Sequence, residues 1–368
     1  MRVIFMGTPD FSVGTLEAVL AAGHEVAAVV TQPDKPKGRG GAMSMSPVKE
    51  AALKHNLTVL QPQRAREEAF IEELRGYEAD VIVVVAFGQL LPAEIIHMPK
   101  YGCINVHASL LPKYRGAAPI QWAVIDGCEY SGVTTMQMNE GLDTGDILLT
   151  EKVKLDPKET GGSLFDRLSD VGAQLLVKTL EEAKAGTLKP QKQNEEEASY
   201  VKMIKKSFGE LDFSKEADAL ERLIRGLNPW PSAFTHLNGK MLKIWDADVY
   251  TKEQAEAEFP EYSTDFKGAE PGQIAAVLPH TFFIGCGKDL LKVNGYNEAI
   301  TGWGSEDHEL VCRLINNGVR KRTIKFAGIV FHLHHELHGT DNLNNNRSIL
   351  NETKVRKLTW CDKGIIQN

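Results

Sequence analysis

Strand-like and helix-like segments alternate along the first 125 residues, and this alternation constrains the fold more than any other feature. Residues 81–85 read Val-Ile-Val-Val-Val, a continuous β-branched run that is typical of a central parallel strand covered on both faces. Shorter apolar runs at 2–6, 26–31 and 57–60 are separated by helix-like segments. Repeated strand–helix–strand units predict a Rossmann-like α/β fold, in which an open, mostly parallel sheet has flanking helices.

Composition narrows the class of protein. The net charge of −7 gives no global argument for nucleic-acid binding, so any such surface must be a local basic patch. Five cysteines are scattered without CxxC spacing, which indicates a reducing compartment and argues against disulfides or a zinc site. The apolar run at residues 1–6 is too short for a signal sequence or a membrane span. We therefore expect a cytoplasmic protein that has no zinc site and no membrane partner.

The length of 368 residues predicts two or three domains. Strand–helix alternation ends in a long helix, so we expect a first domain at 1–186 and a polar, charge-rich linker at 187–205. The next segment, 206–277, combines one amphipathic helix with short alternating strands, which suggests a small OB-like β-barrel. The apolar helix positions are Leu220, Leu223, Ile224 and Leu227, and the expected strands are 233–237, 241–247 and 272–277.

The candidate functional stretch is residues 102–116, Gly-Cys-Ile-Asn-Val-His-Ala-Ser-Leu-Leu-Pro-Lys-Tyr-Arg-Gly. In a strand, Asn105 and His107 point to one face, and the apolar Ile104 and Val106 point to the other. Such a pair places a hydrogen-bond donor beside a proton carrier, although an isolated Asn-x-His more often only binds a neighbouring loop. A proline-fixed loop and then Arg115, a cation beside a glycine, follow the strand.

Two other loops are expected near this stretch. The segment Ala86-Phe87-Gly88 follows the 81–85 strand, at the carboxyl edge where open α/β sheets bind ligands. The loop at 139–146 contains two aspartates, and Asp143 is the candidate partner of His107, with Asp146 as the competing choice.

A long polar loop at 32–45 carries Lys35, Lys37 and Arg39 among glycines and prolines. Its charges suit contact with a phosphate backbone, although a solvated mobile loop is an equally good interpretation.

With these segments together, residues 1 to about 277 resemble the methionyl-tRNA formyltransferase family. The basic Pro-Asp-Lys-Pro-Lys-Gly-Arg-Gly loop, the Asn-x-His and Ser-Leu-Leu-Pro motifs, Asp-Thr-Gly at 143–145 and Asn-Pro-Trp-Pro at 228–231 carry the resemblance. It implies formyl transfer from 10-formyltetrahydrofolate to the α-amine of methionyl initiator tRNA. No metal is implied.

The resemblance also implies roles for individual residues. Asn105 would stabilise the oxyanion, and His107 would carry the proton from the attacking amine to the leaving nitrogen. Asp143 would orient the imidazole and stabilise its charged form. The lysines and the arginine of the basic loop would enter the acceptor arm of the tRNA. The folate donor would be held by Ala86, Phe87, Gly88, Ser109, Leu110, Leu111 and Pro112.

From about residue 278 the sequence changes character. Residues 278–368 resemble the acceptor-side half of family-2-like, galactosyltransferase-type glycosyltransferases, an α+β fragment. That resemblance implies sugar-acceptor roles for Glu306 and Asp307 and a metal role for His332 or His334. The nucleotide-sugar half is missing, and Asp-Ala-Asp at 246–248 is read as a chance match to its metal motif at an ordinary strand edge.

A junction near 277–280 would leave the β-barrel incomplete, so we expect unpaired strand edges and lower order beyond about residue 250. The alternatives are a formyltransferase acting on an amino-sugar nucleotide, a glycosyltransferase-related fusion and a non-catalytic folate- or RNA-binding protein. The basic loop argues against the amino-sugar enzyme, and the missing donor half argues against the glycosyltransferase. The presence of Asn105, His107 and Asp143 together argues against a non-catalytic protein.

Overall fold

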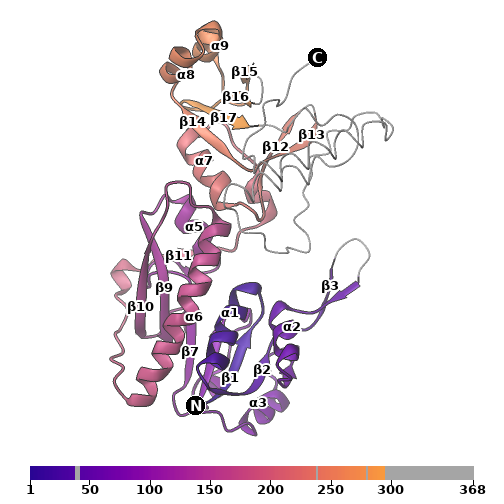
Figure 1. Cartoon of the computed structure of the whole chain (residues 1–368), viewed down its shortest axis with the longest axis vertical. Coiled ribbons are helices and arrows are strands. Elements are labelled where there is room, and N and C mark those ends of the chain that lie inside the picture. The colour runs from indigo at the N-terminus through magenta and orange to yellow at the C-terminus, as the bar shows by residue number, and fades with distance from the viewer. Residues whose placement is uncertain (38–41, 238, 279–280, 295–368) are drawn as a thin grey trace, which may run out of the picture. The chain divides into compact units, whose positions relative to one another are not determined.

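The computed structural model describes residues 1–37, 42–237, 239–278 and 281–294 (Figure 1). The chain divides into two compact units, Met1–Ile204 and Lys205–Asn368. Each unit is described by itself below.

A seven-stranded mixed sheet forms the centre of the first unit, in the order β10-β9-β7-β6-β1-β2-β5. The five strands from β7 to β5 are parallel, and β9 and β10 extend the sheet in antiparallel pairing. The predicted mostly parallel α/β sheet is therefore confirmed. The strands are β1 Arg2–Gly7, β2 Glu25–Val30, β5 Val59–Leu60, β6 Val81–Val85, β7 Cys103–His107, β9 Tyr130–Gln137 and β10 Ile147–Lys154.

Helices cover both faces of this sheet, because alternate residues of each buried strand point to opposite sides. In β6, Val81, Val83 and Val85 pack on one side, and Ile82 and Val84 pack on the other. Figure 1 shows α1 and α6 together on the first side. That side is covered by α1 Asp10–Ala21, α2 Pro47–Lys54, α5 Pro119–Ile125 and α6 Gly161–Ala185, and the other by α3 Glu68–Arg75 and α4 Ala93–Ile96.

The helix ends follow local sequence chemistry. The Ser46 hydroxyl accepts a hydrogen bond from the Lys49 amide at 3.1 Å, with Pro47 in the first turn, as the Ser-Pro pattern predicts. At the other end of the unit, α6 begins in a capping box of Thr160 and Ser163 and is followed by Gly186, its C-cap, in left-handed backbone.

The prediction of an irregular loop at 32–45 is wrong in one respect, because two short segments of it pair as an antiparallel hairpin. The two strands are β3 Lys35–Lys37 and β4 Ala42–Ser44. Asp34 at the base accepts from Lys49 Nζ at 2.7 Å and from Gln61 Nε2 at 2.8 Å. The bond from Lys49 is the main reason that the pKa of Asp34 is lowered.

The segment expected to be a linker is bound to the first unit. It contains η1 Glu195–Glu197 and β11 Tyr200–Val201, and β11 pairs in parallel with β8 Arg115–Gly116. Backbone hydrogen bonds in both directions also join Gln191 to Ile147 at the start of β10.

The second unit contains a four-stranded antiparallel sheet, in the order β14-β17-β16-β15, and a hairpin of β12 and β13. The predicted amphipathic helix is confirmed as α7 Ala217–Gly226, with Leu220, Leu223 and Ile224 buried, followed by buried Leu227. The other elements described in this unit are η2 Lys206–Gly209, β12 Ala233–Leu237, β13 Lys240–Ile244, β14 Ala247–Tyr250, α8 Lys252–Glu258, η3 Pro260–Tyr262, α9 Ser263–Gly268, β15 Ile274–Leu278, β16 Thr281–Gly285 and β17 Leu290–Asn294.

Three features of this unit differ from the prediction. The strand expected at 241–247 is interrupted between β13 and β14, and helices α8 and α9 lie in the interval before β15. The sheet also continues across residue 277, because β16 and β17 pair with each other and with β15 and β14.

Phe283 of β16 occupies the core of this sheet. The rings of Tyr250, Phe259 and Phe266 meet it edge-on at centroid distances of 5.5, 5.6 and 5.1 Å. Residues 252–278 and 281–294, where we expected lower order, thus form helices and strands around one aromatic cluster. The rest of that expected region lies outside the described residues.

Candidate active site

The candidate site lies at the carboxyl edge of the parallel strands. Strands β1, β6 and β7 are neighbours in the sheet and run in the same direction, so their last residues share one edge. Gly7 pairs with Val85, and Val84 pairs with Asn105. The segments after β6 and β7, which sequence analysis singled out separately, are thereby brought together.

The turn after β6 has a constrained backbone. Ala86 and Gly88 are exposed with φ of 46° and 85°, whereas Phe87 between them is buried. The Phe87 carbonyl accepts from Thr8 Oγ1 at 2.9 Å and from Gln32 Nε2 at 3.2 Å. A left-handed alanine costs about 1–2 kcal/mol, so such anchoring is needed to hold the turn. Thr8 and Gln32 were not predicted as site residues, and their signal in the sequence is their position one and two residues after β1 and β2.

Strand β7 presents Asn105 and His107 as the alternation predicts. Ile104 and Val106 pack in the core on the opposite face. Asn105 is partly exposed, and its side chain makes no hydrogen bond to another residue in the described part of the chain. Its amide is therefore available as a donor at the sheet edge.

His107 is 7% exposed and is held by two different groups. Its Nε2 lies 2.9 Å from the carbonyl oxygen of Tyr114. Because a carbonyl only accepts, Nε2 carries a proton in this arrangement. Its Nδ1 lies 3.8 Å from Asp143 Oδ1. Nδ1 is thus the ring nitrogen that faces the carboxylate.

Tyr114 orients the imidazole through its backbone, which has a φ of 59°. The Tyr114 amide donates to Ser199 Oγ at 2.8 Å, and its hydroxyl donates to Asp126 at 3.0 Å. Burial is the main cause that raises the pKa of the Tyr114 phenol above its ordinary value. Both the backbone and the side-chain hydroxyl of Tyr114 are therefore fixed by hydrogen bonds.

The loop between β9 and β10 carries the carboxylate. Asp143 has a φ of 54°, and its Oδ2 accepts from the Gly116 amide at 2.8 Å. A side chain on Gly145 would lie 1.7 Å from the carbonyl of Gln137, so the turn closes tightly only with glycine there. Asp146 contributes its backbone carbonyl, which accepts from the Gln137 amide at 2.8 Å. Of the two candidate aspartates, it is Asp143 whose carboxylate lies beside His107.

The loop after β7 is tied to β9. Ser109 Oγ donates to the Lys113 carbonyl at 2.7 Å, and Thr134 Oγ1 donates to the Ser109 carbonyl at 2.7 Å. Ser109 and Leu111 are buried, whereas Leu110 and Pro112 are partly exposed. The Ser109 hydroxyl is therefore used within the loop.

Arg115, the cation that follows the proline-fixed loop, is paired within the protein. Its side chain is fully buried, with Nε donating to Gln193 Oε1 at 2.9 Å. Its two terminal nitrogens bind both carboxylate oxygens of Glu195, at 2.9 and 2.7 Å, and Nη1 also donates to the Tyr200 hydroxyl. The guanidinium thus ties the connector to the loop after β7.

The basic loop is only partly described. Lys35 is exposed on β3, and Lys37 is the last residue of that strand. Arg39 lies outside the described residues, as do Glu306, Asp307, His332 and His334.

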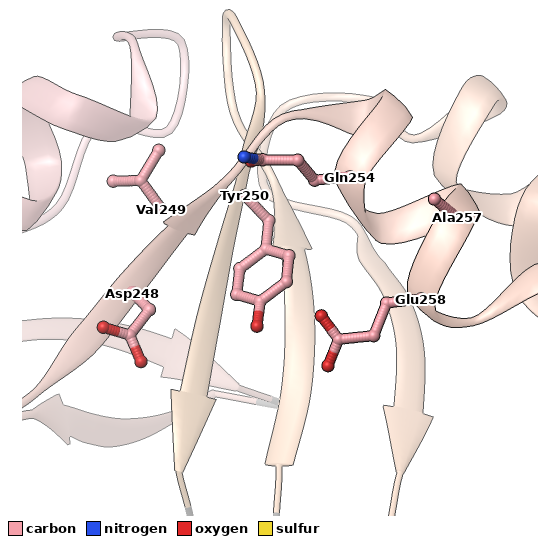
Figure 2. A pocket seen from close by; sticks show the side chains of 6 residues that line it. All are labelled: Asp248, Val249, Tyr250, Gln254, Ala257 and Glu258. Carbon is pink, nitrogen blue, oxygen red and sulfur yellow. The ribbon is translucent and has the colours of Figure 1, made fainter.

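A hollow on the second unit lies between β14 and α8 (Figure 2). Its lining includes Asp248 and Tyr250 from β14 and Glu258 from α8. Asp248 pairs with Lys292 on β17, and β14 is the edge strand of its sheet, as expected for an ordinary strand edge. The described ranges contain no group of three or more His, Cys, Asp or Glu side chains arranged to hold a metal ion. None of the helices described has the length and apolar character of a membrane span.

Family models match most of the chain. The Formyl transferase model matches residues 1–180, and the Formyl transferase C-terminal domain model matches 203–299. The second match passes residue 277, where we expected the resemblance to end, and it includes β16 and β17. A model described as the N-terminal domain of galactosyltransferase matches residues 285–336. Residues 285 and 290–294 of that match belong to the antiparallel sheet.

Individual proteins give closer matches. The methionyl-tRNA formyltransferase of Lachnospira eligens is 70% identical over 294 residues, which cover 80% of this chain and 91% of the relative. That of Agathobacter rectalis is 58% identical over 293 residues, covering 80% and 90%. Among solved structures, an N-formyltransferase from Helicobacter canadensis, with folinic acid and dTDP-3-aminofucose, has a TM-score of 0.56 at 18% identity. The match covers 80% of this chain and 98% of that one.

The mixed sheet, the residues at its carboxyl edge and the two family models make this chain a formyl transferase. The identity to the curated relatives narrows the class. The chain belongs to the methionyl-tRNA formyltransferase family.

Proposed function

We propose that this protein transfers the formyl group of 10-formyltetrahydrofolate to the α-amine of methionyl initiator tRNA. The observation that carries the proposal is the placing of Asn105, His107 and Asp143 at one edge of the sheet, in a chain of this family. Together they supply a free donor, a proton carrier and a carboxylate.

Asn105 acts on the developing oxyanion. When the amine lone pair attacks the formyl carbon, the carbonyl electrons move to oxygen, and the Asn105 amide donates to that oxygen. A donor that has no other described hydrogen-bond partner needs no bond to be broken before it does so. Such a donor typically contributes about 2.7–4 kcal/mol to transition-state stabilisation.

His107 moves one proton through Nδ1. It takes the proton from the attacking nitrogen and returns it to N10 of the folate as the bond from carbon to N10 breaks, so the reaction is balanced without another acid or base. The Tyr114 carbonyl keeps the other ring proton on Nε2. The Asp143 carboxylate, 3.8 Å from Nδ1, stabilises the imidazolium that forms between the two transfers.

The folate donor is proposed to lie against the two segments that border these residues. Ala86 and Gly88 offer exposed backbone on either side of buried Phe87. The partly exposed Leu110 and Pro112 offer apolar contact. The buried Ser109 and Leu111 hold that loop in place, Ser109 through its hydrogen bond within the loop.

The β3–β4 hairpin is proposed to contact the acceptor arm of the tRNA through Lys35, Lys37 and Arg39. The support is its charge and the exposure of Lys35, together with a base that is fixed by Asp34, Lys49 and Gln61. Cytoplasm is the proposed location, because charged initiator tRNA is the acceptor.

The domain division remains part of the proposal. A catalytic domain at 1–186 and a connector at 187–205 are followed by a partial β-barrel domain of the OB type, which begins at 206. Strands β16 and β17 extend this domain beyond residue 277 to Asn294. The glycosyltransferase-like segment follows it.

The choice of acceptor is the part of the proposal that an assay can decide. The purified chain is incubated with 10-formyltetrahydrofolate and either methionyl initiator tRNA or an amino-sugar nucleotide. We expect formyl transfer to the tRNA and none to the sugar. Transfer to the sugar nucleotide alone would replace this function by the alternative one.

A further inference from the structure

The connector contains one side chain that reaches the proposed catalytic aspartate. Gln193 is half-buried in a stretch where most neighbours are exposed. Its Nε2 donates to the carbonyl of Asp143 at 2.8 Å and to the carbonyl of Gly145 at 2.7 Å. Its Oε1 accepts from Arg115 Nε at 2.9 Å. Both N–H donors and the oxygen of this amide are therefore engaged, and its orientation is set by the chemistry of its partners.

Arg115 fixes the other side of Gln193. The guanidinium is fully buried, and it binds Glu195 with two hydrogen bonds and Tyr200 with one. Its ring contact with Tyr200, at 5.4 Å, adds to this anchoring. Both connector partners lie within seven residues of Gln193 along the chain, so the connector around it is held on the first unit.

The turn that Gln193 binds needs to be held. Asp143 adopts left-handed backbone, which costs a residue other than glycine about 1–2 kcal/mol. Its carboxylate is fixed by the Gly116 amide, and Gln193 fixes the carbonyls on either side of Thr144. The Gly116 amide thus holds the Asp143 carboxylate, and the adjacent Arg115 holds the backbone of the turn through Gln193.

We propose that Gln193 is a positioning residue for formyl transfer, which sets the place of the Asp143 carboxylate beside His107 without touching substrate. The inference rests on the proposed role of Asp143. It predicts that loss of Gln193 slows the chemical step only while that carboxylate is present.

The test is a double-mutant cycle on the full chain, with kcat and KM for 10-formyltetrahydrofolate measured on charged initiator tRNA. Gln193→Ala in the wild-type background should lower kcat about 10- to 100-fold, as expected for a misplaced catalytic group. KM for the folate should change less than about twofold. In the Asp143→Asn background the same substitution should lower kcat by less than about threefold.

Asn194→Ala is the matched control, because the one side-chain hydrogen bond of this neighbouring amide to the described residues is accepted from the Glu196 backbone, within the connector. It should leave kcat within about twofold of wild type. Gln193→Glu keeps the acceptor for Arg115 but loses both donors to the turn, so it should lower kcat at least as much as Gln193→Ala with a smaller loss of thermal stability.

Equal loss of kcat in both backgrounds, or full activity of Gln193→Glu, would overturn the inference while leaving the proposed function standing. A wild-type chain that formylates no methionyl tRNA, or an Asp143→Asn variant with wild-type activity, would instead count against the proposed function itself.

Discussion

Replacement of Asn105 separates catalysis from folding. Its side chain is partly exposed and binds no other residue in the described ranges, so its removal breaks no hydrogen bond seen there. Asn105→Ala should therefore change the free energy of unfolding by less than about 0.5 kcal/mol, as for an ordinary surface substitution. The transition state, in contrast, loses its oxyanion donor, at about 2.7–4 kcal/mol, which corresponds to a fall in kcat of roughly 10²- to 10³-fold.

The assay combines formylation kinetics on charged initiator tRNA with urea unfolding of the same preparations. Asn105→Asp is the matched variant, because it keeps the size of the side chain but has no amide donor. It should lose at least as much kcat as Asn105→Ala, and KM for the folate should stay within about threefold. A variant that keeps more than a tenth of wild-type kcat would refute the oxyanion role. A fall in activity that follows a fall in stability would refute the separation of the two effects.

Three further outcomes follow from described contacts. Gly116→Ala should destabilise the protein by about 1–3 kcal/mol and lower kcat, because Gly116 has a φ of 99° and the added Cβ would lie 2.6 Å from the Val201 carbonyl oxygen. Urea unfolding and formylation kinetics measure the two effects, and no change in either would contradict the prediction. Burial raises the pKa of the Cys103 and Cys286 thiols to about 12, so neither should be alkylated by iodoacetamide at pH 8 before the chain is unfolded, as peptide mass spectrometry can show. The bond from its arginine partner lowers the pKa of Glu195, so this carboxylate stabilises the fold above its unfolded pKa, and that contribution is lost as the pH falls. The stability lost in Glu195→Gln should thus be largest near neutral pH and vanish well below pH ~4; the same loss at both pH values would argue against the pair.

The sheet was predictable because its signals are local. The β-branched run at 81–85 places alternate valines on the two faces, and Ser46 and Pro47 mark the start of a helix from their own chemistry. The partners of His107 were less accessible to sequence reasoning. Distance along the chain did not distinguish Asp143 from Asp146, and the tight turn at Gly145 directs the first toward the imidazole.

Other parts of the structure depend on long-range contacts that no local sequence pattern indicates. In the sequence Arg115 is a cation beside a glycine, and no local pattern shows that Glu195, eighty residues later, neutralises it. Gln193 lies in a polar segment with no periodicity, so its role is visible only once the Asp143 turn is placed beside it. By contrast, α8 carries a capping box of Thr251 and Gln254, a local signal that sequence analysis could have used.

Strands β16 and β17 were missed for a different reason. Their residues also resemble part of a glycosyltransferase, and the aromatic and β-branched side chains that suit either protein were assigned to that fragment. In the structure, Phe283 and Leu290 are fully buried in the sheet with β14 and β15.

The most direct test of the account is the formylation of charged initiator tRNA by the wild-type chain and by His107→Ala, with 10-formyltetrahydrofolate as the donor. The wild-type chain should produce formylmethionyl tRNA, and His107→Ala should be slower by about 10²- to 10⁴-fold, the usual contribution of a general acid–base. Equal rates for the two proteins would contradict the mechanism.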